Sequence, residues 1–188
     1  MHRRIRFYAI ALLVLVLAGC ASGAQQVPAL QAAAQVDLPR YMGRWYIIAN
    51  IPHSAEAGKV GAYAEYRLRE DGRIDDFYYA RDGSFDREIE LTERVAWVAD
   101  RARSAHWKVR SYWPFTDDYL ILYVSDDYRY ALAGRPSRDH AWIFAREPDL
   151  PEWTYAGLVA RLAAQHYDVA RLRKVPQTRE PLGQPGFQ

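Results

Sequence analysis

Short segments in which apolar and polar residues alternate follow one another between residues 43 and 146, with turn residues between them. In one segment Trp107, Val109 and Trp113 share a face, while Lys108 and Arg110 occupy the opposite face. This is the period of a β-strand that buries one face and exposes the other to water. Many such segments, bounded by clusters of Gly, Pro, Asp and Ser, predict an all-β sandwich or barrel.

The period changes after Pro151, where apolar residues recur at i, i+3, i+4 and i+7 between residues 152 and 165. That spacing predicts one amphipathic helix, which we expect to pack on the barrel. Residues 169–175 alternate again and predict a final strand. Residues 177–188 contain Pro and Gly at short intervals and predict a disordered tail.

The N-terminus has the order of a secretory signal peptide, with basic residues, then an apolar run over residues 7–16, then Leu17-Ala18-Gly19-Cys20. The apolar run is too short for a permanent membrane helix, so residues 1–19 are expected to be removed. The small residues before the cysteine resemble the bacterial lipobox, which implies that the Cys20 sulfur carries diacylglycerol. Cys20 is the only cysteine and has no partner for an internal disulfide, which leaves a free thiol as the alternative.

Residues 20–36 are predicted to be the lipidated cysteine and a flexible tether, because residues 21–36 contain no charge and no aromatic side chain. A short helix over residues 30–36 is the alternative. Ala21 follows the cysteine where inner-membrane lipoproteins commonly have Asp, so the lipobox resemblance implies a lipid anchor in the bacterial outer membrane. About 165 residues remain after the signal peptide is removed, which is enough for a single domain. We assign that domain to residues 37–176.

Charge excludes two classes of protein. Of the residues, 26% are charged and the net charge is +2, with basic and acidic residues interspersed, so no stripe indicates nucleic-acid binding. An outer-membrane β-barrel would have to hold Lys108, Arg110, Glu65 and Arg67 on faces that contact lipid. Each such charge would cost a few kcal/mol near the bilayer midplane, which argues against that fold.

Three sequence motifs occur in a recognisable order. Gly43-Arg44-Trp45 follows a short predicted helical turn, Ser125 to Tyr130 contains Asp126 and Tyr128, and residues 142–146 end at Arg146. Together they resemble the three motifs of the lipocalins, over nearly all of residues 37–176, and with the lipobox they resemble the bacterial outer-membrane members of that family. The resemblance implies an eight-stranded antiparallel up-and-down barrel with one C-terminal helix. It also implies a structural base, with Arg146 stacked on Trp45, made of Gly43, Trp45, Asp126, Tyr128 and Arg146.

A barrel of eight strands is wide enough to hold one small ligand among its inward side chains. These side chains are expected to be apolar, and the resemblance implies that they bind a fatty acid or a lysophospholipid. Lys59, Arg81 and Lys108 are candidates to meet a charged headgroup at the mouth. The candidate ligand-binding residues are Ile47, Ala49, Tyr66, Trp97, Val109, Trp113, Tyr130 and Leu132.

The sequence gives no signature of an enzyme. The histidines lack metal-ligand spacing and no Gly-x-Ser-x-Gly motif is present, so neither a metal, a cofactor nor catalysis is expected. The leading hypothesis is an anchored protein that stores, scavenges or carries lipids in the bacterial envelope. A lipid-modifying enzyme with a buried acid or base in the cavity, and a filled barrel that binds proteins, are the alternatives. The oligomeric state stays open, with a homodimer among the options.

Overall fold

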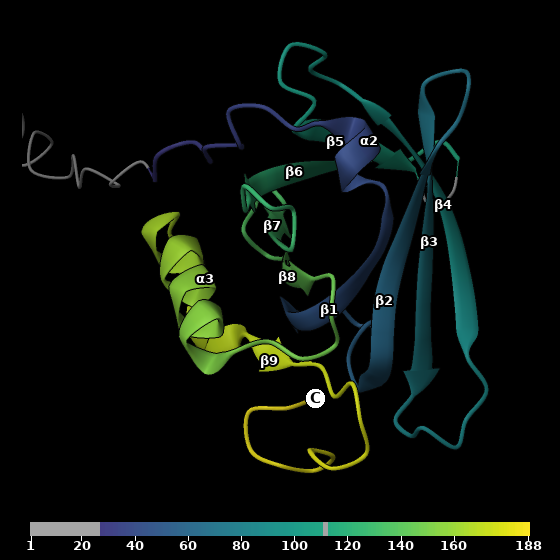
Figure 1. Cartoon of the computed structure of the whole chain (residues 1–188), viewed down its shortest axis with the longest axis vertical. Coiled ribbons are helices and arrows are strands. Elements are labelled where there is room, and N and C mark those ends of the chain that lie inside the picture. Colours follow the sequence, from purple (N-terminus) through teal and green to yellow (C-terminus); the bar gives the residue numbers. More distant parts are fainter. Residues whose placement is uncertain (1–26, 111–112) are drawn as a thin grey trace, which may run out of the picture.

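A computed structural model describes residues 27–110 and 113–188 (Figure 1), so the expected signal peptide and Cys20 lie outside the described residues. Strands β1 to β8 each pair antiparallel with the next strand, and β1 also pairs with β8, which closes the barrel. The predicted eight-stranded barrel with a C-terminal helix is confirmed. The strands are β1 (Gly43–Ile51), β2 (Lys59–Leu68), β3 (Arg73–Asp82), β4 (Glu90–Val98), β5 (His106–Arg110), β6 (Asp117–Val124), β7 (Tyr130–Gly134), β8 (Ala141–Ala145) and β9 (Arg173–Lys174).

Helix α3 (Glu152–Ala164) lies against one side of the barrel (Figure 1). It begins directly after Pro151 and buries Leu158 and Leu162 against Ile143 and other residues on the outside of the barrel wall. A second, larger core fills the inside of the barrel, so parts of the wall are buried on both faces. In the described part of the chain, no helix is long and apolar enough to cross a membrane.

Four predicted inward residues point outward, and burial on both faces of the wall accounts for the two in β7. The register of β1 shifts between Ile47 and Ala49, and this bulge turns Ala49 toward α3. In β7, Tyr130 and Leu132 belong to the outer core, while Ala131 and Ala133, which alternate with them, face inward. Trp97 is half-buried on the outer face of β4, with the Arg110 guanidinium 5.8 Å from its ring centre.

The fifth misplaced residue is Trp113, which lies beyond the end of β5 and is 80% exposed. We expected it to share the inward face of β5, but β5 is described over His106–Arg110, and Trp113 lies before β6 with its side chain exposed. The predicted final strand is also shorter than expected. A 3-10 turn, η2 (Val169–Arg171), precedes β9, which pairs with β1 over two residues.

Both chain ends of the domain are attached to the barrel rather than free. The tail expected to be disordered donates hydrogen bonds from Gln177 to the carbonyls of Ile47 and Ala62, at 2.8 and 3.0 Å. Its last residue, Gln188, donates a hydrogen bond to the side chain of Asn50 at 2.6 Å. The predicted tether is likewise bound to the barrel wall over its described part, residues 27–36, where backbone bonds join it to β6 and to the loop before β5.

Candidate ligand-binding site

The barrel has a closed end, formed where β1 begins and β8 ends. The Arg146 guanidinium lies 3.8 Å from the centre of the Trp45 ring, and the Trp45 Nε1 donates a hydrogen bond to the Tyr41 carbonyl at 2.7 Å. Arg146 also donates to the carbonyls of Arg44 at 2.6 Å and Met42 at 2.9 Å. A cation over an indole is favourable by about 1–2 kcal/mol when it is partly desolvated. The geometry is therefore that of a structural plug.

Helix α2 (Leu38–Tyr41) crosses this closed end and is tied to the loop between β6 and β7. The Tyr128 hydroxyl accepts a hydrogen bond from the Asp37 backbone at 2.8 Å, and the Arg40 guanidinium lies 4.1 Å from the Tyr128 ring centre. Asp126 contributes its backbone carbonyl, which accepts from Arg40 at 3.0 Å. The carboxylate that shapes the loop is that of Asp127, the neighbour of the predicted Asp126 in the same motif, which accepts from the Ser125 hydroxyl at 2.6 Å.

Gly43 joins α2 to β1 with a φ of +86°, a conformation that residues with a side chain rarely adopt. A Cβ atom at this position would lie 3.5 Å from the Arg146 guanidinium. The backbone conformation therefore requires glycine at the first motif. A Cβ atom there would only make an ordinary van der Waals contact with Arg146, so lack of space is not the reason.

Above the plug, a cavity of about 520 Å³ extends toward the opposite, open end of the barrel. The open end is formed by the loops at residues 52–58, 83–89 and 135–140 and by residues 113–116. Pockets that hold small ligands have volumes of about 300–1,000 Å³. Of the predicted ligand-binding residues, Ile47, Tyr66 and Val109 line the cavity, and Ala49, Trp97, Trp113, Tyr130 and Leu132 do not. The other aromatic and aliphatic side chains on its wall are those of Ala55, Ala64, Tyr78, Tyr119, Trp142 and Phe144.

Tyrosine hydroxyls meet at the inner part of the cavity. The hydroxyl oxygens of Tyr66 and Tyr119 lie 3.2 Å apart, and that of Tyr41, in the core beside them, lies 3.5 Å from Tyr119. Burial raises the pKa of all three phenols well above their usual value. They therefore remain neutral and can donate or accept hydrogen bonds.

An ion pair stands on the cavity wall, where only apolar residues were expected. Asp76 and Arg94 are direct cross-strand partners on β3 and β4, with Arg94 Nε 2.9 Å from Asp76 Oδ2. Burial alone would lower the pKa of Arg94, but the Asp76 carboxylate raises it above its usual value. A signal for this pair was present, because Asp76 alternates with Ile74 and Tyr78 on the inward face of β3.

Glu56, in the loop between β1 and β2, is another charged residue that sequence reasoning missed. Its side chain is buried at the mouth and accepts hydrogen bonds from Asn50 Nδ2 at 2.9 Å and Trp142 Nε1 at 3.0 Å. Burial by itself would raise the pKa of Glu56, but the hydrogen bond and charge of His53 and the charge of Arg94 outweigh it and lower the pKa. The carboxylate is thus ionised and occupied by donors.

The cations proposed for a headgroup do not line the cavity. Lys59 pairs with Glu90 at 2.7 Å, and Lys108 pairs with Asp118 at 2.7 Å. Arg81 is also absent from the cavity wall. At the mouth the cation is Arg135, which is paired with Asp117.

A barrel closed by a plug at one end, with a ligand-sized cavity open at the other, defines a class of small-ligand-binding β-barrels. The model of the lipocalin-like domain matches residues 36–177 of this chain. The chain belongs to the lipocalin family, whose members bind small hydrophobic ligands and are in general not enzymes.

Relatives of this chain come from plants and bacteria. Temperature-induced lipocalin-1 of Arabidopsis thaliana is 35% identical over 155 residues, covering 78% of this chain and 82% of that protein. Outer membrane lipoprotein Blc of Escherichia coli (strain K12) is 30% identical over 142 residues, covering 75% and 79%. Among solved structures, insecticyanin from the tobacco hornworm Manduca sexta matches with a TM-score of 0.63 and 18% identity, covering 84% of this chain and 88% of that chain.

Proposed function

We propose that this protein binds one fatty acyl lipid, a fatty acid or a lysophospholipid, in its barrel cavity and carries or stores it at the bacterial outer membrane. The observation that carries the proposal is the cavity of about 520 Å³, closed below by Trp45 and Arg146 and lined by aromatic and aliphatic side chains together with polar and charged ones. A single acyl chain is a long apolar body, and an enclosed apolar wall is what removes it from water.

The polar groups of the cavity favour an amphiphile over a plain hydrocarbon. The Tyr66 and Tyr119 hydroxyls and the Asp76–Arg94 pair offer hydrogen bonds to the polar part of a lipid. A buried polar group stays favourable only while it is hydrogen-bonded, so a ligand with polar atoms replaces cavity water at less cost than one without.

Anchoring through a lipidated Cys20 supplies the membrane location. Two observations support it, namely the signal-peptide order that ends in Leu17-Ala18-Gly19-Cys20 and the likeness to a relative named as an outer membrane lipoprotein. A diacylated cysteine carries more than one acyl chain, which is what stable membrane attachment requires.

A second candidate is an enzyme that modifies a lipid in the cavity, because buried charged residues stand on the cavity wall. Catalytic acids and bases work best with a pKa near the working pH and with a free site for the proton. Asp76 is already paired with Arg94, and the pKa of Glu56 is lowered, which makes Glu56 a poor proton donor. Binding without turnover therefore accounts better for these residues.

A displacement titration with a fluorescent fatty acid tests the proposal. Val109→Trp places a large side chain on the cavity wall, while Val95→Trp makes the same change on the opposite face of the neighbouring strand β4. We expect saturable binding by the wild type, at least tenfold weaker binding by Val109→Trp and unchanged binding by Val95→Trp. Absence of saturable binding, or equal affinities in both variants, would contradict the proposal.

A further inference from the structure

The N-terminal segment, residues 27–36, runs beside β6 from the closed end, with Val36 buried in the inner core. Near α2, the Val36 amide donates to the Arg103 carbonyl at 2.8 Å, in the loop that joins β4 and β5 at the closed end. Further along, the Ala33 amide donates to the Ile121 carbonyl of β6 at 2.8 Å. Ile121 lies in the middle of that strand, so the segment has by then moved away from the closed end.

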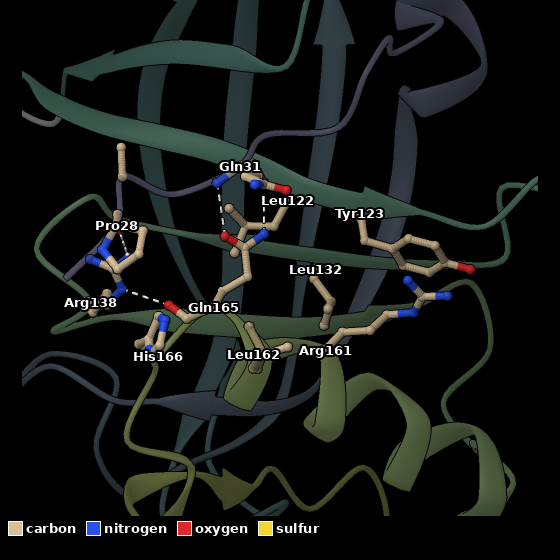
Figure 2. A pocket seen from close by; sticks show the side chains of 12 residues that line it. Pro28, Gln31, Leu122, Tyr123, Leu132, Arg138, Arg161, Leu162, Gln165 and His166 are labelled. Atoms are coloured by element: carbon tan, nitrogen blue, oxygen red, sulfur yellow. Dashed lines mark hydrogen bonds between the residues drawn. The ribbon is translucent and has the colours of Figure 1, made fainter.

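Figure 2 shows where the segment goes next. The Gln31 backbone and the Gln165 side chain exchange hydrogen bonds of 2.8 and 2.7 Å. The Arg138 guanidinium then donates to the Pro28 carbonyl at 2.5 Å and to the Gln165 carbonyl at 2.7 Å. Arg138 belongs to the loop between β7 and β8, at the open end. The chain therefore leaves the described domain beside the mouth of the cavity.

Little chain remains between this point and the expected anchor. Cys20 precedes Val27 by seven residues (27 − 20). An extended chain spans at most about 3.3–3.6 Å per residue, so these residues reach no further than about 25 Å. The strands of the barrel have up to 10 residues, and because barrel strands tilt by about 35–45° the barrel is about 25 Å tall. The residues that lead to Cys20 therefore set out from the side of the open end, with a reach no greater than the height of the barrel.

The open end also carries exposed apolar side chains, which we name the mouth rim: Ile89, Leu91, Trp113 and Phe115. They are 41%, 46%, 80% and 65% exposed, and they lie in or beside the loops that precede β4 and β6. At the closed end, residues 69–72, 99–105 and 125–129 contain no exposed large apolar side chain. Leu68, at the end of β2, is the exposed large apolar residue beside those loops.

Several charges near the mouth rim are paired within the protein. Lys59 pairs with Glu90 at 2.7 Å and with Asp82 at 3.5 Å, and Arg179 donates to Asp86 at 2.9 Å. Arg87, two residues before Ile89, is exposed and makes no ion pair among the described residues, and a rim with Trp and aliphatic side chains suits the membrane interface. The surface thus fits a lipid bilayer through apolar contact.

We propose that the anchored protein stands with its open end on the membrane surface and its mouth rim inserted at the lipid headgroups. A lipid then moves between the bilayer and the cavity without crossing bulk water. This inference rests on the proposed anchor at Cys20 and on the proposed lipid ligand. The partner of the mouth rim is the bilayer that holds the anchor. Because this contact is apolar, we expect the orientation to persist on phosphatidylcholine vesicles and at high salt.

Label positions at the two ends of the barrel test the orientation. Because lipidation occupies the only native cysteine, Thr116→Cys at the open end and Glu70→Cys at the closed end each provide a unique free thiol for a fluorophore. The lipidated full chain is placed in phosphatidylcholine vesicles that contain nitroxide-labelled lipid. We expect the label at position 116 to be quenched at least threefold more than the label at position 70. Equal or reversed quenching would overturn the proposal.

A matched pair of double variants tests the mouth rim. Trp113→Ser with Ile89→Ser removes side chains that are 80% and 41% exposed, and Trp153→Ser with Leu68→Ser removes side chains on α3 and at the end of β2 that are 79% and 42% exposed. We expect the rim variant to slow uptake of a labelled lipid from vesicles at least fivefold and to lower quenching at position 116, with no change in the control. Equal effects in both variants would overturn the role of the rim.

The two proposals fail differently. If no variant or wild-type chain binds fatty acid in solution, the proposed function fails, while quenching still reports which end faces the bilayer. If fatty acid binds normally but position 116 escapes quenching and the particle mass doubles, the mouth rim is an interface between two copies of this chain. That result would overturn the membrane orientation and leave the lipid-binding function standing.

Discussion

The two ends of this barrel are built from different kinds of contact. At the closed end, Trp45 is fully buried, and Arg146 stacks on it and donates to several backbone carbonyls. At the open end, Glu56 and Arg135 surround a cavity mouth, and Trp113 is 80% exposed. The closed end therefore contributes mainly to the stability of the fold, and the open end gives a ligand access to the cavity. Substitutions at the two ends should separate folding from binding.

The largest expected effect is at the closed end. Trp45→Ala removes a fully buried indole and should lower the free energy of unfolding by about 3–5 kcal/mol. Trp113→Ala, at the open end, should change it by no more than about 0.5 kcal/mol because the side chain is mostly exposed. Urea unfolding followed by circular dichroism measures both. Similar losses in the two variants would remove the contrast between the ends.

The ion pair on the cavity wall should show strong coupling. Arg94→Met leaves the buried Asp76 carboxylate without its partner and should cost about 3–5 kcal/mol of unfolding free energy. The double variant Asp76→Leu with Arg94→Met leaves no unpaired charge and should recover most of that loss. A double-mutant cycle measured by urea unfolding gives the coupling. Additive losses would show that the two side chains do not depend on each other.

Glu56 should make the mouth sensitive to acid. Its pKa in the folded protein is lowered from the ordinary value of 4.5, so its contribution to stability is present above pH 4.5 and is lost as the pH falls further. Glu56→Gln should cost about 1–3 kcal/mol at pH 7, because one of its donors loses its acceptor. Unfolding free energies between pH 3 and pH 7 test this, and a variant that loses stability with acid as steeply as the wild type would exclude Glu56 as the cause.

The smallest effect is expected for the N-terminal segment. Gln165→Ala removes a side chain that exchanges hydrogen bonds with the Gln31 backbone and should cost about 0.5–1.5 kcal/mol. If this segment orients the barrel, the same variant should also lower the ratio of quenching between labels at positions 116 and 70. An unchanged ratio would mean that Gln165 is not needed to hold the open end toward the membrane.

Predictions from the sequence succeeded where a strand exposes one face to water and where residues belong to a compact sequence motif. Trp107 and Val109 alternate with charged residues, and Trp45 and Arg146 occur in recognisable motifs, so each lies where the pattern or the resemblance indicated. It failed in β7, where Leu132 lies in a strand buried on both faces, because no polar residue marks the outside.

Three further failures have particular physical causes. Ala49 follows a bulge in β1, and a bulge changes which face a side chain points to without leaving a mark in the alternation. Asp76 and Arg94 were missed because a cavity wall was assumed to be apolar, although a charged residue can point inward when its cross-strand neighbour has the opposite charge. Glu56 lies in a loop, where periodicity carries no information.

Native mass spectrometry of the full mature chain, extracted gently from a bacterial envelope, tests the central claim most directly. The account predicts a complex of one protein with one molecule that is released and recovered unchanged as a fatty acid or a lysophospholipid. It also predicts that this mass is missing from Val109→Trp and retained in Val95→Trp. A wild-type chain that carries no such lipid, together with no displacement of a fluorescent fatty acid at micromolar concentration, would contradict the claim that the cavity is a lipid-binding site.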